Sequence, residues 1–61
     1  MTYTVLVHMI SGNTITIQGV SGYKYNVDSQ CFLVEKNGYS IMFNKDCVEC
    51  IGREFDLENR G

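Results

Sequence analysis

The order of apolar and polar residues predicts β-strand for most of the chain between Thr2 and Gly52. The segment Tyr3–Ile10 is rich in β-branched and aromatic residues, which favour strands. Thr14–Gln18 alternates strictly between apolar and polar side chains, so its two isoleucines share one face. Ser11–Asn13 lies between these segments and has the glycine and asparagine that tight turns prefer. We therefore predict a first β-hairpin over residues 3–18.

A second hairpin is predicted by Asn37-Gly38, which separates the apolar segments 31–36 and 39–43. Asn-Gly is the preferred dipeptide of a two-residue type I′ turn. A last strand is expected over 47–51. The segment 19–26 is less regular, and its two glycines predict a bulge or a sharp bend.

These elements predict an all-β domain, a five-stranded antiparallel meander over residues 1–52. Strands this short do not form a two-sheet sandwich, whereas a bent sheet that closes on itself removes its exposed edges. We therefore expect a small barrel with no lasting helix. Residues 53–61 are expected to form a charged C-terminal tail.

The strand order resembles that of SH3-like and Sm-like small β-barrels. Val7–Ile15 is similar to the first strand and turn of Sm-like proteins, and Phe43–Ile51 is similar to their closing segment. The family's N-terminal helix has no counterpart, and Tyr23–Asn26 does not match the aspartate and asparagine of its RNA pocket. The resemblance therefore implies topology and not RNA binding. The chain also resembles small orphan proteins of phages and prophages, which implies an inhibitor that blocks or sequesters a host protein.

Several strands carry apolar residues on both faces. A 61-residue chain buries only about 60% of its unfolded surface, so surplus apolar side chains favour an interface and a homo-oligomer. The alternative is that a one-residue bulge exchanges the faces. The residues assigned to the core are Val5, Val7, Ile15, Ile17, Phe32, Val34, Ile41 and Phe43. The residues predicted to point outward, as an interface, are Leu6, Ile10, Leu33, Met42 and Ile51.

Tyr23, Lys24 and Tyr25 are the candidate ligand-binding residues. Two aromatic rings with a lysine between them could stack on bases, contact another protein, or pack at the predicted bend. The first option defines the alternative function, an Sm-like binder of nucleic acid or nucleotides. Five basic residues are scattered among seven acidic ones, and the net charge of −2 disfavours a nucleic-acid partner.

The cysteines offer one chemical motif. Cys47 and Cys50 form a C-x-x-C, to which Cys31 and His8 could add the remaining ligands of a Cys3His zinc site. Residues three apart on a strand point to opposite faces, however, and free cysteine often packs as a small apolar residue. We therefore predict structural cysteines, with no metal and no cofactor.

The sequence contains no phosphate loop, nucleophile elbow or paired-carboxylate motif, so an enzyme is not expected. The first residues lack the basic flank of a secretory signal, and no apolar run approaches the ~20 residues of a membrane span. These features favour a cytoplasmic protein with reduced thiols and no membrane partner. The functional hypothesis is a non-catalytic binding and self-assembly module.

Overall fold

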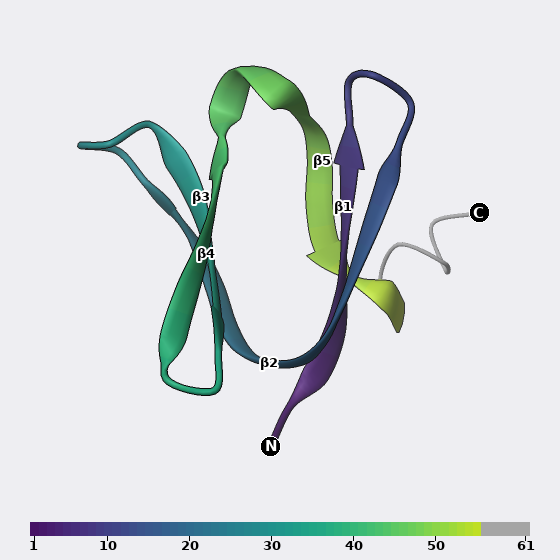
Figure 1. Ribbon diagram of the computed structural model, residues 1–61, viewed down its shortest axis with the longest axis vertical. Coiled ribbons are helices and arrows are strands. Elements are labelled where there is room, and N and C mark those ends of the chain that lie inside the picture. The colour runs from purple at the N-terminus through teal and green to yellow at the C-terminus, as the bar shows by residue number, and fades with distance from the viewer. Residues whose placement is uncertain (56–61) are drawn as a thin grey trace.

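The computed structural model describes residues 1–55, which form one antiparallel sheet of five strands in the order β4-β3-β2-β1-β5 (Figure 1). The strands and the single 3-10 helix η1 are β1 (Tyr3–Met9), β2 (Thr14–Asn26), β3 (Cys31–Lys36), β4 (Tyr39–Asn44), η1 (Lys45–Cys47) and β5 (Val48–Arg53). The predicted all-β, five-stranded antiparallel meander is confirmed.

Strand β2 is 13 residues long and bends sharply in its middle (Figure 1). Its first half pairs with β1 and its second half pairs with β3. Gly19 has a φ of 72°, and the register with β3 shifts between Val20 and Gly22. The bulge expected from the two glycines is therefore confirmed, and it divides the sheet into two halves that face each other.

The predicted turns are also confirmed. Asn37 and Gly38 have φ values of 51° and 82°, the two positive values that a type I′ turn requires. In the first hairpin, Gly12 has a φ of 99° and donates its N–H to the carbonyl of Met9 at 2.9 Å. A side-chain amide stabilises the connection after β4 in a similar way, because Asn44 Oδ1 accepts the N–H of Asp46 at 2.8 Å and caps η1.

Strand pairing leaves the sheet open. In residues 1–55, β4 and β5 are the two ends of the ladder and are not paired with each other. The connection between them is η1, which is held by backbone hydrogen bonds from Lys45 N to Gln30 O (3.1 Å) and from Ile10 N to Cys47 O (3.0 Å). The fold therefore has two edge strands on either side of an opening.

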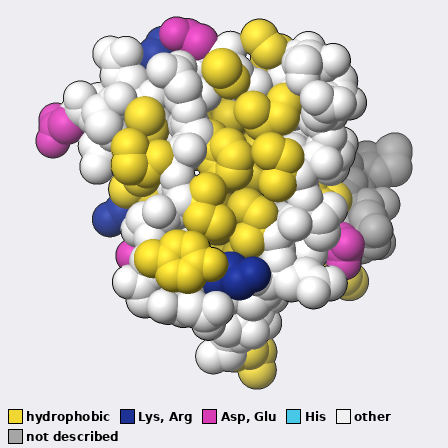
Figure 2. All heavy atoms as spheres, viewed as in Figure 1, with side chains coloured by type: hydrophobic (Ala, Val, Ile, Leu, Met, Phe, Trp, Pro, Cys, Tyr) yellow, Lys and Arg dark blue, Asp and Glu magenta, His cyan; other side chains and the backbone are white. Residues whose placement is uncertain are grey.

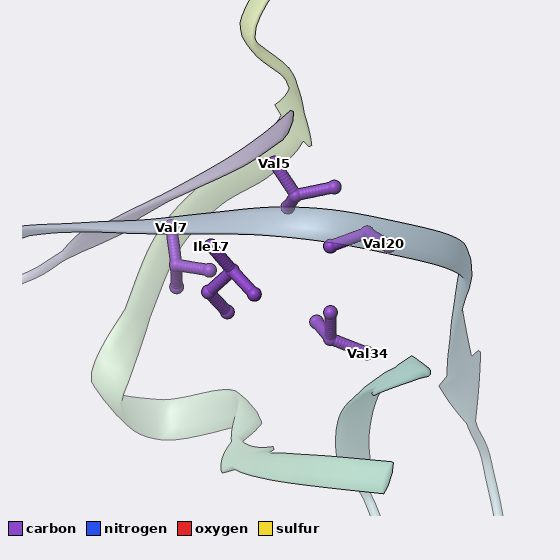
Figure 3. Packing of buried hydrophobic residues seen from close by; sticks show 5 residues of the cluster. All are labelled: Val5, Val7, Ile17, Val20 and Val34. Atoms are coloured by element: carbon purple, nitrogen blue, oxygen red, sulfur yellow. The ribbon is translucent and has the colours of Figure 1, made fainter. Parts of the chain in front are cut away.

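The core lies inside the bend of β2 (Figure 3). Its buried members are Val5, Val7, Ile17, Val20 and Val34. Partly buried side chains pack around them, namely Tyr3, Met9, Tyr23, Ile41, Phe43, Val48 and Ile51.

The core prediction is correct for the four other buried residues but omits Val20, which is completely buried. Val20 lies between the glycines of the bulge, where the two-residue period of a regular strand does not apply. Ile15 was assigned to the core and does share a face with Val7, but it lies near the strand end and is 38% exposed. Phe32 is half-buried.

The prediction that Ile51 points outward is wrong. Ile51 pairs with Val7 across the β1–β5 ladder, and residues opposite each other share a face, so its side chain packs against the core. The predicted boundary of the tail is also one residue early, because β5 extends to Arg53. Residues 56–61 of the expected tail lie outside the described residues.

Replacing Val20 by Ala tests whether Val20 contributes to the core as its burial indicates. We expect Val20→Ala to lower the free energy of unfolding by about 2 kcal/mol, because it leaves a cavity beside the other core valines. Val27→Ala is the matched control. Val27 is 74% exposed in the β2–β3 turn, so its truncation is expected to change stability by less than about 0.5 kcal/mol. Urea unfolding measures both, and equal effects would contradict this description of the core.

Candidate interaction surface

Two predicted interface residues lie side by side on the outer face of β3 and β4. Leu33 and Met42 are direct cross-strand partners, and Met42 is 60% exposed. Lys24 of β2 is the partner of Leu33 on its other side. The three side chains form a row across β2, β3 and β4, in which a lysine is followed by two apolar residues that end at the β4 edge.

The other outward residues do not join this row. Leu6 is half-buried on the outer face of β1, where its partners are Thr16 and Gly52. Ile10 is 64% exposed in the turn after β1. Neither residue shares a cross-strand partner with Leu33 or Met42. The five predicted interface residues therefore do not form one surface. Leu33 and Met42 lie together, Leu6 and Ile10 lie elsewhere, and Ile51 packs against the core.

The candidate ligand-binding residues are separated by the strand alternation. Tyr23 packs against the core and meets Tyr3 edge-on, with ring centroids 6.2 Å apart. Tyr25 contacts Phe32, with centroids 5.0 Å apart. Lys24 lies on the opposite face of β2 from both tyrosines. This geometry favours the packing role considered for the tyrosines and does not assemble a platform with a lysine between them.

The opening of the sheet exposes apolar side chains that the sequence did not single out as a group. Ile41 and Phe43 of β4, together with Val48 and Ile51 of β5, pack against the core and are only partly buried. We call these four residues the open seam. Figure 2 shows hydrophobic side chains gathered in the same region, between the β3–β4 hairpin and β5. The alternation within each strand predicts which side chains face inward, but it does not reveal which two strands end the ladder.

The four residues considered for zinc do not converge. Cys50 is the cross-strand partner of His8, whose Nδ1 lies 3.0 Å from Thr14 Oγ1. Cys31 pairs with Asn44 in the other half of the sheet, and its thiol donates to a backbone carbonyl. All three cysteines are free thiols, and residues 1–55 contain no group of three or more possible metal ligands.

A small cavity lies where β1 begins and β5 ends. Its volume is about 280 Å3, and its lining residues are Tyr3, Thr4, Arg53, Glu54 and Phe55. The Arg53 guanidinium carbon lies 4.3 Å from the centroid of the Tyr3 ring, a cation–π contact. The sequence pattern does not indicate this cavity, because it predicts that Arg53 belongs to the tail. The β-strand pattern continues through Gly52, but only the pairing with Val5 shows that Arg53 belongs to the sheet.

Comparisons with models of protein families, with curated proteins and with solved structures found no match to this chain. Among residues 1–55, no helix is long and apolar enough to cross a membrane.

We predict that an excess of a metal chelator leaves the melting temperature unchanged. Cys31 lies in a different half of the sheet from His8 and Cys50, so the strand register does not form a tetrahedral site. A structural zinc ion contributes roughly 10–16 kcal/mol in small zinc domains, and its removal would unfold a chain of this size. Circular dichroism during heating, with and without chelator, measures the effect. A large fall in melting temperature would contradict the prediction.

Proposed function

We propose that this protein is a non-catalytic binding and self-assembly module that acts as a homo-oligomer. The observation that carries the proposal is the open sheet. Strands β4 and β5 both lack a neighbour on one side in the described part of the chain, and the open seam lies between them. A second copy of the chain is the partner that we assign to these edges.

The unpaired edges provide the directional part of the interaction. Each edge strand is six residues long, and about every second residue of such a strand points its N–H and C=O away from the sheet. An added strand pairs with these groups and extends the sheet. Proline and charged side chains usually block such pairing at an edge strand, but the chain contains no proline and β4 has no charged residue.

The small core gives an energetic reason for self-assembly. In residues 1–55 only five side chains are buried, and four of these, all valines, are fully buried. Burial of each contributes about 1.5–3 kcal/mol. A chain of 61 residues is near the size at which folding needs further support, such as disulfides or oligomerisation. The three cysteines are free thiols. Covering the open seam with another copy would bury more apolar surface and thus stabilise each subunit.

The edges also suggest how the copies would associate. Pairing β4 of one copy with β5 of the next is a head-to-tail contact, which gives a ring if the rotation closes and a filament otherwise. A small barrel of the SH3-like or Sm-like type, with its opening between β4 and β5, is supported by the strand order, the bend in β2 and the 3-10 turn that links the two edges. Leu33 and Met42 would then lie beside the contact.

Two narrower functions follow from the sequence. The resemblance to small phage proteins supports an inhibitor that presents the same edges to a host protein. Nucleic-acid binding has less support, since Lys24 lies on the opposite face from Tyr23 and Tyr25 and the net charge is −2.

A single lysine at the β4 edge should weaken assembly. For wild type we expect a mass in solution that is a multiple of the 6.9 kDa chain. Met42→Lys should weaken association about tenfold or more, because burial of a methionine contributes about 1.5–3 kcal/mol and each 1.4 kcal/mol is tenfold. Thr16→Lys is the control, since Thr16 is exposed on β2 away from either edge.

Sedimentation equilibrium over a range of concentrations measures both variants. A monodisperse wild-type monomer at high micromolar concentration would refute the assembly proposal, and so would equal weakening by both lysines.

Hydrogen exchange tests the position of the contact. If edge strands pair between copies, amides of β4 and β5 should exchange more slowly as the protein concentration rises, because assembly gives their N–H groups new acceptors. The amides of β1, which already lies between β2 and β5, provide the internal comparison. Mass spectrometry of the exchanged peptides measures the change. Added protection confined to other segments would mean that the copies associate elsewhere.

A further inference from the structure

The cavity at the end of β5 combines features that suit a specific ligand. Arg53 and Glu54 add a cation and a carboxylate to its lining, Tyr3 and Phe55 supply apolar surface, and Thr4 adds a polar side chain. At about 280 Å3 the cavity is near the lower limit for pockets that hold small molecules or a single amino-acid residue. It is distinct from the open seam, and no residue belongs to both.

One face of the Arg53 guanidinium lies against an aromatic ring, a contact that does not use its hydrogen-bonding edge. Its carbon lies 4.3 Å from the Tyr3 ring centroid, which fixes one face of the planar group. Tyr3 is itself braced by its edge-on contact with Tyr23. In residues 1–55 the one side-chain ion pair joins Lys45 and Asp46, so Arg53 has no carboxylate partner there. The contact with the ring leaves the N–H groups of the guanidinium able to donate to a ligand.

The neighbouring Glu54 restricts the class of anion. A phosphate dianion at Arg53 would be repelled by the Glu54 carboxylate and would meet only one cation in the cavity. A carboxylate carries a single charge and matches the guanidinium fork through two parallel hydrogen bonds. A ligand with an N–H donor close to its carboxylate would also give Glu54 a hydrogen-bond partner.

We propose that this cavity binds a terminal carboxylate that has an adjacent amide N–H and an apolar or aromatic side chain. Arg53 binds the carboxylate, Glu54 accepts the amide N–H, and the rings of Tyr3 and Phe55 contact the side chain. This chemistry is shared by N-acyl amino acids and by the C-terminal residue of a peptide. Capture of a chain terminus is a known mode of peptide recognition. The proposal does not depend on self-assembly, because a single subunit contains the whole cavity.

The test is a calorimetric titration of the full chain with three probes. These are N-acetyl-phenylalanine, its uncharged C-terminal amide, and an N-acetylated tripeptide that ends in phenylalanine. We expect at least one of the two acids to bind about tenfold or more tightly than the amide, because a charge-assisted pair is lost in the amide. Tighter binding of the tripeptide would identify a peptide terminus as the ligand, and equal binding of both acids would identify the terminal residue alone.

Variants test whether the cavity is the origin of the preference for the acids over the amide. Arg53→Gln should remove the preference for the acids over the amide, whereas Lys45→Gln, which removes a cation elsewhere on the surface, should preserve it. Arg53→Lys keeps the charge but loses the two-pronged hydrogen bonds, so an intermediate preference is expected. Circular dichroism establishes that each variant is folded, and amide chemical shifts of wild type locate the bound probe.

The proposal is overturned if neither acid binds more tightly than the amide, if Lys45→Gln removes the preference as Arg53→Gln does, or if the shifted amides lie away from Tyr3 and Arg53. Sedimentation of the same samples measures self-assembly separately. The wild-type protein can bind the acids without forming oligomers, or form oligomers without binding the acids, so the two proposals can fail independently.

Discussion

The bend in β2 is the constraint on which the rest of the structure depends. A strand of 13 residues would normally extend the sheet in one plane, but the bulge at Gly19–Gly22 turns its second half toward the first. This single distortion places the β3–β4 hairpin opposite β1 and β5. Val20, at the bend, and Val34, on β3, can then meet Val5 and Val7 in one core. Without the bend, the same alternating strands would have a flat apolar face and no interior.

The bend also explains why the sheet has two edges so close together. One bent strand is enough to enclose five side chains, yet β4 and β5 are joined by η1 and not by a ladder of hydrogen bonds. The backbone bonds from Lys45 and Ile10 hold this connection in place at its two ends. The result is a core that is closed on the side of β2 and partly exposed along the open seam. Edge groups and apolar side chains thus occur together, which is the combination that strand addition uses.

The sequence was most informative where local chemistry alone decides the structure. Asn37-Gly38 specifies a type I′ turn because both residues tolerate positive φ, and Gly19 permits the bulge in β2 for the same reason. The sequence was least informative where the pairing register of the strands decides which face a side chain occupies. The pattern leaves Val20 out of the core and predicts an outward Ile51, because each lies beside an irregularity that interrupts the two-residue period. These irregularities are the bulge in β2 and the register shift between His8 and Met9 in the β1–β5 ladder. The open seam and the Arg53 cavity depend on which strands are neighbours, a property of the whole sheet that no single segment encodes.

Strand β5 shows how one short segment can serve several purposes through alternation and position. Its pairing with β1 directs Ile51 into the core, places Cys50 beside His8 on the outer face, and leaves its other edge open. At its end, Arg53 lies across from Val5 and above the Tyr3 ring. An aromatic ring positions a cation without neutralising it, whereas a carboxylate partner would do both. In a chain with more acidic than basic residues, the Tyr3 ring holds one guanidinium without supplying a counter-charge.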